Sequence, residues 1–328
     1  MVTSPLLDSF GRLHTYLRVS VTDRCNYRCT YCMPQEGLHW KPRSDLLTYE
    51  ETSRLVETFA GLGVHRIRLT GGEPTVRSDI RALVSSLAGV AGIDDLSMTT
   101  NAHSLDRLAE PLADAGLDRV NVSLDSLNPA TFERLTRGGN LDRVLAGIQA
   151  ARAAGLTPIK INTVLLQDNQ ADLLPLVDAF APFADDTVLR FIEYMPFEAR
   201  WHESISAEQA RGVINQVHPM VPESENLGGG PARYWRLLDS GLRIGFIAPL
   251  SEHFCGSCNR LRLSADGQLR TCLSRENNPS LRDLARSGAS SDLLEEAVRR
   301  IVLGKPLGHG CLLEGGTPFE GRMTAIGG

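Results

Sequence analysis

Three cysteines lie close together near the start of the chain, at Cys25, Cys29 and Cys32, with three and then two residues between them. Thiolates are soft ligands, and three of them in so short a segment predict an iron–sulfur cluster. Because a fourth cysteine is missing, one iron is expected to be open to another ligand. The alternative is a zinc ion with a distant fourth ligand such as His39, although zinc usually takes its cysteines in two closely spaced pairs.

A second cysteine triad occurs late in the chain, at Cys255, Cys258 and Cys272. It again offers three thiolates instead of four, so a second cluster with one open iron is expected. Arg260 and Arg262 follow Cys258, two residues apart, and would lie on one side of an extended segment. The alternative for these two arginines is a charge pair in solvent.

Composition limits the surroundings of these triads. The chain has 328 residues, 42% hydrophobic and 22% charged, with seven cysteines and a net charge of -5. A chain of this size buries a core without help from disulfides or metal, so the cysteines call for a chemical explanation. Nucleic acid is not expected as a partner. The first residues lack a cationic and apolar leader and no apolar run could span a membrane, so we expect a reducing cytoplasm and no membrane.

Short β-branched segments alternate with helical patterns between residue 17 and about residue 194, which is typical of βα units around a parallel sheet. The helical pattern after residue 48 is opened by a capping box, Thr48-x-x-Glu51. Six strands are expected where a closed barrel needs eight, so an open, partial (βα)6 barrel of the α/β class is predicted. The expected strands are residues 17–21, 66–70, 96–100, 119–124, 159–165 and 188–194.

The predicted strands alternate apolar residues with polar or cationic ones. Arg18, Arg68, Ser123 and Lys160 all fall on the polar side of this alternation. We expect the apolar faces to contact the helices and the polar faces to line the barrel interior. Buried cations without partners are costly, so such an interior predicts a bound anion. The alternative is a set of buried salt bridges to Asp or Glu.

The βα pattern weakens after residue 195. Strand-like pieces at residues 242–247 and 261–263 and a helix near residues 292–303 follow a Gly-rich loop. We therefore divide the chain into a barrel, residues 1–232, and a C-terminal extension, residues 233–328, that carries the second triad and packs over the open side of the barrel. Cys311 has no neighbours at ligand spacing and is interpreted as a thiol outside the chemistry.

The segment LRVSVTDRCNYRCTYCMP, residues 17–34, resembles the signature of the radical S-adenosylmethionine (SAM) enzymes. The resemblance implies that Cys25, Cys29 and Cys32 hold three irons of a [4Fe-4S] cluster and that SAM chelates the fourth. An electron then cleaves SAM to methionine and a 5′-deoxyadenosyl radical. The segment LTGGEP, residues 69–74, resembles the Gly-rich motif that receives the methionine amino group of SAM, where glycine permits a close backbone approach.

The likeness to one family within this superfamily runs along nearly the whole chain. TGGEPTVR, TTN, VNVSLDSL, IKINTV, FIEYMP, the second triad and the final Gly327-Gly328 occur in the order and spacing of the GTP 3′,8-cyclase family of molybdenum cofactor biosynthesis. This resemblance implies two [4Fe-4S] clusters, SAM as cofactor and GTP as substrate. The implied reaction removes hydrogen from the ribose C3′ and joins that carbon to guanine C8.

The same resemblance assigns residues to each ligand. Those implied to contact GTP are Arg18, Arg68, Thr99, Lys160, Arg260 and Arg262. Those implied to lie at SAM are Tyr31, Gly72, Glu73, Ser123 and Met195. Arg260, Arg262 and the tail residues Gly327 and Gly328 are implied to serve catalysis, the tail by entering the active site. Implied partners are a flavodoxin or ferredoxin reductant, a downstream cyclic pyranopterin monophosphate synthase and a second copy of the chain.

Two other functions are open to the sequence. A different radical SAM enzyme, such as a peptide-modifying maturase, would keep the first triad but needs a peptide groove and usually more cysteines than the second triad offers. A zinc-binding scaffold without catalysis would hold zinc alone. The arginines expected inside the barrel favour the cyclase over both, because neither alternative needs a site for a triphosphate.

Overall fold

The structure is a computed structural model that describes residues 4–195, 203–224, 229–273 and 280–308. Within these ranges the strands are β1 Tyr16–Ser20, β2 Arg66–Thr70, β3 Asp95–Thr100, β4 Arg119–Ser123, β5 Ile159–Leu165, β6 Thr187–Glu193, β7 Met220–Glu223, β8 Arg233–Leu237, β9 Arg243–Ile247, β10 Arg260–Leu263 and β11 Leu269–Arg270. The α-helices are α1 Tyr49–Gly61, α2 Ile80–Ala88, α3 Leu105–Asp114, α4 Pro129–Thr136, α5 Leu141–Ala153, α6 Leu173–Phe180, α7 Ala207–Val217, α8 Arg282–Arg286 and α9 Ser291–Leu303.

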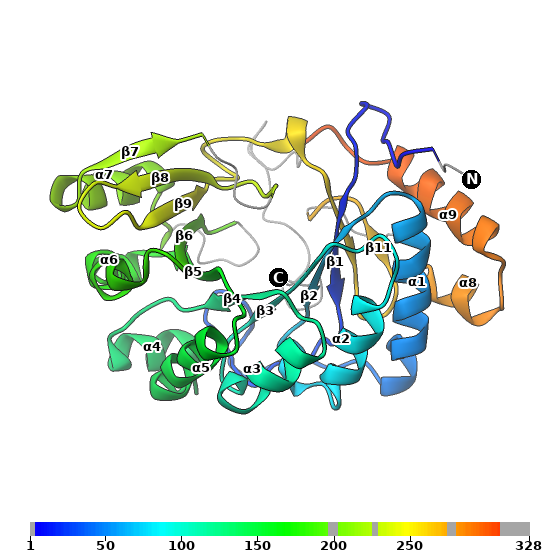
Figure 1. Cartoon of the computed structure of the whole chain (residues 1–328), viewed down its shortest axis with the longest axis horizontal. Coiled ribbons are helices and arrows are strands. Elements are labelled where there is room, and N and C mark those ends of the chain that lie inside the picture. Colours follow the sequence, from blue (N-terminus) through cyan, green and yellow to red (C-terminus); the bar gives the residue numbers. More distant parts are fainter. Residues whose placement is uncertain (1–3, 196–202, 225–228, 274–279, 309–328) are drawn as a thin grey trace.

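The strands form one sheet in the order β11-β10-β1-β2-β3-β4-β5-β6-β9-β8-β7. Strands β1 to β6 are neighbours in chain order and all pair in parallel. Helices α1 to α5 lie along the outer side of this row (Figure 1). The predicted α/β partial barrel is confirmed, and each of the six expected strands begins and ends within one residue of its expected bounds.

The alternation along the strands sorts side chains as predicted. Leu17, Val19, Ile67 and Leu69 are fully buried in the apolar core that the strands share with the helices. Helix α1 begins at the predicted capping box, in which the backbone N–H of residue 51 donates to the Thr48 hydroxyl and the backbone N–H of residue 48 donates to the side-chain carboxylate of residue 51. The opposite, polar faces of the strands are thereby left to line a cavity.

The last third of the chain extends the sheet at both of its edges. Strand β9 pairs in parallel with β6, and β8 and β7 add to it in antiparallel fashion. Strand β10 pairs in parallel with β1 and carries β11 beside it. These strands cover the edge N–H and C=O groups that β1 and β6 would otherwise leave unpaired. We expected the extension to pack over the open side of the barrel. Its strands instead lie at the two ends of the row formed by β1 to β6. The domain boundary at residue 232 stays a prediction.

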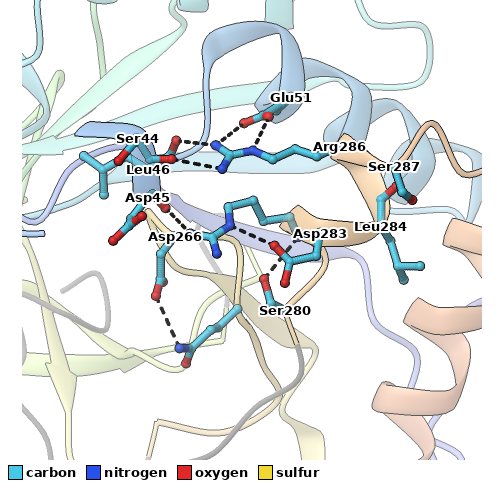
Figure 2. Close-up of polar contacts among 12 residues, drawn as sticks. Ser44, Asp45, Leu46, Glu51, Asp266, Ser280, Asp283, Leu284, Arg286 and Ser287 are labelled. Atoms are coloured by element: carbon cyan, nitrogen blue, oxygen red, sulfur yellow. Dashed lines mark hydrogen bonds and ion pairs between the residues drawn. The ribbon is translucent and has the colours of Figure 1, made fainter. Parts of the chain in front are cut away.

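Helix α8 fastens the extension to the start of the barrel (Figure 2). The Arg286 guanidinium donates from Nε to the Glu51 carboxylate at 2.7 Å and to the backbone carbonyls of Ser44 and Leu46 at 2.9 and 3.1 Å. Arg282 donates to the carbonyl of residue 45 at 2.7 Å. Because α8 follows β10 and β11, these contacts help to hold the two strands that lie between Cys258 and Cys272 of the second triad.

None of the helices in the described ranges combines the length and the apolar character needed to cross a membrane.

Candidate active site

One large cavity, with a volume of about 370 Å³, lies on the polar faces of the strands. This volume is within the roughly 300–1,000 Å³ of a typical small-molecule pocket. Every predicted site residue that the structure describes lines it: Arg18, Cys25, Cys29, Tyr31, Cys32, Arg68, Gly72, Glu73, Thr99, Ser123, Lys160, Met195, Cys255, Cys258, Arg260, Arg262 and Cys272. The predicted tail residues Gly327 and Gly328, like Cys311, lie outside the described residues.

The Gly-rich turn after β2 packs directly on the loop that carries the first triad. A Cβ on Gly72 would lie 2.3 Å from the carbonyl oxygen of Arg24, and one on Gly71 would lie 2.6 Å from that of Thr22. The Gly72 N–H donates to the Thr22 carbonyl at 2.8 Å. The close approach that glycine permits here is therefore to the cysteine loop itself, which fixes that loop against the end of β2.

Glu73 anchors the same region from inside the core. Its carboxylate accepts hydrogen bonds from the Thr75 hydroxyl at 2.6 Å, the Thr100 hydroxyl at 2.7 Å and the Asn101 N–H at 2.7 Å. Burial raises the pKa of Glu73, although these hydrogen bonds oppose the shift. The side chain thus ties the ends of β2 and β3 together beside the first triad.

Tyr31, between the second and third cysteines, is held by a buried acid. Its hydroxyl donates to the Asp125 carboxylate at 2.6 Å, and the Tyr194 hydroxyl donates to the Tyr31 carbonyl at 3.2 Å. Burial raises the pKa of Asp125 to about 6, against the opposing effect of the Tyr31 and Val164 hydrogen bonds. We did not predict Asp125 from the sequence; its place directly after β4, at the carboxyl end of a barrel strand, was the available signal.

Strand register brings three arginines side by side on the cavity face. Arg18 of β1 is paired with Arg262 of β10 on one side and with Arg68 of β2 on the other. Neighbouring strands lie only about 4.8 Å apart, so the three side chains share one face at short range. Burial, and then neighbouring cations, lowers the pKa of Arg18 and of Arg68 to about 10 and lowers that of Arg262 as well. We call these three residues the arginine row.

Neutral groups, and not carboxylates, surround two members of this row. Arg68 Nε donates to the Ser97 hydroxyl at 3.2 Å, and the buried Arg18 Nε has no hydrogen-bond partner among the described residues. The nearby Asp95 instead pairs with Arg119 at 2.6 Å, at the amino ends of β3 and β4. This arrangement argues against the alternative of buried salt bridges and favours a polyanionic ligand.

Arg190 of β6 is a cavity residue that we did not predict from the sequence. Its Nε donates to the Asn162 side-chain oxygen at 2.9 Å and its Nη2 to that of Asn121 at 2.8 Å. Burial lowers its pKa. Its position between Leu189 and Phe191 is the same alternation that identified the other strand cations, so the signal was present in the sequence.

The second triad lies in a more cationic environment than the first. Burial raises the pKa of the Cys25 thiol to about 11. Burial also opposes ionisation of Cys258, but the charges of Arg260 and Lys305 outweigh it and lower the pKa of that thiol to about 7. The Arg260 guanidinium also lies over the Phe254 ring, 5.0 Å from its centre.

The donor sets of both triads fit iron–sulfur clusters. The six described cysteines form no disulfides, and within the described ranges no three His, Cys, Asp or Glu side chains converge as ligands of a single metal ion. A four-iron cluster takes one thiolate per iron, so its ligands need not meet at one point. His39, the fourth ligand of the zinc alternative, lines a separate small pocket that includes none of the cysteines.

Sequence comparisons agree with this geometry. Residues 19–180 match the Radical SAM superfamily, and residues 187–311 match Molybdenum Cofactor Synthesis C. The chain is 45% identical over 322 residues to GTP 3′,8-cyclase of Rhodopseudomonas palustris strain TIE-1, covering 95% of this chain and 92% of the relative. It is 42% identical to GTP 3′,8-cyclase of Marinobacter nauticus over the full length of both chains. The chain belongs to the GTP 3′,8-cyclase family.

Membership of the GTP 3′,8-cyclase family settles the cofactor class. The cofactors are SAM and [4Fe-4S] clusters, and the cysteines present are consistent with them. The zinc-scaffold hypothesis is therefore wrong, and the peptide-modifying alternative is not favoured. Among solved structures, Streptococcus suis SuiB bound to precursor peptide SuiA has a TM-score of 0.64 and 16% identity, covering 97% of this chain and 77% of SuiB. That likeness shows a shared fold alone.

Proposed function

We propose that this chain converts GTP to 3′,8-cyclo-7,8-dihydroguanosine 5′-triphosphate, the first step of molybdenum cofactor biosynthesis. The arginine row carries the proposal, because it lies in the same cavity as both cysteine triads and has the charge that a triphosphate requires. The names of the full-length relatives support the same substrate. The positive potential of a cavity lined by cations attracts a ligand that carries about four negative charges.

The proposed division of labour follows the positions of the residues. The arginine row, Arg190 and Lys160 bind and orient the phosphates and ribose, while Arg260 and Arg262 also flank the second triad. Tyr31, Gly72, Glu73, Ser123 and Met195 line the same cavity and are assigned to SAM by the family resemblance. When bound, SAM and the first cluster supply the radical chemistry. The protein contributes orientation and a site sheltered from water.

Reconstituted protein, kept without oxygen and given SAM and dithionite, is expected to form 5′-deoxyadenosine much faster with GTP than without it. The reason is that a correctly positioned ribose gives up its C3′ hydrogen to the 5′-deoxyadenosyl radical, so that cleavage of SAM leads to product. Chromatography of 5′-deoxyadenosine and of the cyclised nucleotide measures the result. ATP serves as the matched control because it supplies the same triphosphate with another base. Equal rates with and without GTP would contradict the substrate assignment.

Lys160 gives a pH-dependent prediction. Burial, and then Arg190, Arg119 and Arg68, lowers its pKa to about 6, whereas an unfolded lysine has a pKa of about 10.4. Between pH 6 and pH 10, Lys160 is protonated in the unfolded chain but neutral in the nucleotide-free fold. The free energy of unfolding of the nucleotide-free protein should therefore rise with pH over this range. The negative charge of a bound triphosphate should raise the pKa of Lys160, so at pH 8 the lysine should take up about one proton per GTP bound.

Calorimetry of GTP binding in buffers of different ionisation enthalpy measures this proton uptake. At pH 8 the nucleotide is already fully ionised, so the proton comes to the protein. Lys160→Met is expected to abolish the uptake and to weaken binding. Uptake that persists in Lys160→Met would assign the proton to another group.

The C-terminal residues provide a separate test. Deleting Gly327 and Gly328 is expected to leave iron content, SAM binding and the thermal melting curve unchanged while abolishing formation of the cyclised nucleotide. The reason is the family resemblance, which assigns the tail to the active site. Replacing both glycines with alanine keeps the length and provides the matched variant. Full turnover by the truncated chain would remove the tail from the proposal.

The remaining partners are proposed on the same resemblance. A flavodoxin or ferredoxin system supplies the electron, a cyclic pyranopterin monophosphate synthase consumes the product, and the chain works as a homodimer. A cytoplasmic location is proposed from the clustered cysteines of the sequence, since in a reducing compartment such cysteines more often bind metal than form disulfides.

A further inference from the structure

The N-terminal arm, residues 4–15, contacts the second cysteine triad through Arg12. Arg12 is 8% exposed, and its Nη1 donates to the carbonyl of Cys255 at 2.8 Å and to that of Leu307 at 2.9 Å. Its Nη2 donates to the Pro306 carbonyl at 2.7 Å. One guanidinium therefore joins the first cysteine of the triad to the segment that follows α9.

Asp8 holds this guanidinium in place. Its carboxylate accepts from Arg12 Nε at 2.6 Å, from the Arg12 N–H at 3.1 Å and from the Phe10 N–H at 2.9 Å. Asp8 also contacts the ring of the buried His14 at 3.1 Å. The acid is thus committed to orienting Arg12, whose terminal nitrogens stay directed at backbone carbonyls.

Lys305 binds the chain segments that carry the other two cysteines, as Arg12 binds the segment that carries Cys255. It is 4% exposed, and its Nζ donates to the carbonyl of Arg260 at 2.8 Å and to that of Thr271 at 2.5 Å. Residue 260 lies two positions after Cys258, and Thr271 immediately precedes Cys272. A single ammonium group therefore links the two chain segments that carry these cysteines.

The two cations also form one unit. Arg12 binds the carbonyls of the two residues directly after Lys305, so the arm, the end of α9 and all three cysteine segments are fastened at one place. Both Arg12 and Lys305 line the large cavity. Three thiolates bring concentrated negative charge, which the buried ammonium of Lys305 would stabilise, whereas the charge of Arg12 is balanced by Asp8.

We propose that Arg12 and Lys305 are positioning residues of the second cluster, which hold its three cysteine segments at ligating spacing, and that Lys305 also supplies positive charge that favours its reduced form. The inference deepens the proposed function and rests on the second triad holding a cluster. Outer groups of this kind commonly fix ligands and tune the metal group that they surround.

The test compares variants of the full chain after reconstitution. Lys305→Met removes both the charge and the two hydrogen bonds, while Arg12→Lys keeps the charge but cannot bridge the same carbonyls. Arg299→Met is the matched control, because Arg299 also donates to carbonyls of the arm, at residues 4 and 5, but neither bond reaches a segment that carries a triad cysteine. Circular dichroism and melting curves establish that each variant is folded.

Two readouts other than turnover decide the matter. Iron release to a chelator should be at least about tenfold faster for one of the two clusters in Lys305→Met and in Arg12→Lys, and unchanged in Arg299→Met. Electron paramagnetic resonance identifies that cluster as the one whose signal does not respond to SAM. In Lys305→Met its midpoint potential should fall by about 59 mV, which is a tenfold loss of the reduced form for one electron. In Arg12→Lys the potential should stay near that of the unaltered chain.

A folded Lys305→Met variant with unaltered chelator resistance and unaltered potential would overturn the inference. This failure can be told apart from failure of the proposed function. If GTP does not stimulate SAM cleavage but the two variants still lose the second cluster, the substrate is wrong and the positioning role holds.

Discussion

Replacing Arg18 with methionine is expected to weaken GTP binding by about 30- to 4000-fold, because truncating one partner of a buried charge contact costs roughly 2–5 kcal/mol. Arg18 occupies the centre of the arginine row, with Arg262 and Arg68 on the neighbouring strands. Its Nε is buried without a hydrogen-bond partner among the described residues, so the variant removes no hydrogen bond of that atom. Equilibrium binding of GTP to the reconstituted protein measures the loss.

The same variant should make the nucleotide-free protein more stable, not less. Arg68 is buried and Arg18 and Arg262 are half-buried, so removing one of these three adjacent cations relieves repulsion and desolvation. We expect a gain of about 1–2 kcal/mol in unfolding free energy. Arg119→Met is the control, because Arg119 is paired with Asp95 at 2.6 Å and lies outside the cavity lining. It should lose stability and keep GTP affinity. Unchanged GTP affinity in Arg18→Met would show that the row does not bind the triphosphate.

Single cysteine variants should separate the two clusters. Cys29→Ala is expected to retain about four of about eight irons and to lose SAM cleavage by at least about 10⁴-fold, since the cluster that cleaves SAM is gone. Cys272→Ala should also retain about four irons. It should still cleave SAM but should not form the cyclised nucleotide. Iron and sulfide analysis together with chromatography of 5′-deoxyadenosine measures both.

Cys311→Ala is the control for those two variants and should keep all the iron and full turnover. Loss of iron from Cys311→Ala would mean that the division of the seven cysteines into two triads and one bystander is wrong. Equal loss of SAM cleavage in Cys29→Ala and Cys272→Ala would mean that the two clusters do not have separate roles.

Much of the barrel could be predicted because its signals are local. The alternation around Arg18, Arg68 and Lys160 has the period of a strand and reports which side chains share a face. The placement of β9 and β10 could not be predicted in this way, because pairing with β6 and β1 depends on contacts between residues far apart in the sequence. The arginine row is a product of that long-range pairing, since Arg262 meets Arg18 only through β10.

The site was predicted where residue type alone reveals chemistry, and missed where it does not. Cysteine spacing identified both triads. Arg12 and Lys305 gave no such signal, because their roles depend on which backbone carbonyl each one reaches. Asp125 gave only its position after β4, and its role depends on the Tyr31 hydroxyl that it binds. Arg190 was missed although it follows the alternation.

The pairing of β10 with β1 also has a consequence for synthesis of the protein. The ribosome makes the chain from its N-terminus, and domains fold as their residues emerge. Until residues 243–263 have been made, the outer edges of β1 and β6 present unpaired N–H and C=O groups with which other chains could pair. During that interval the loop with Cys25, Cys29 and Cys32 is complete while the second triad does not yet exist. All the cysteine ligands of the first cluster are therefore present in the growing chain before any ligand of the second.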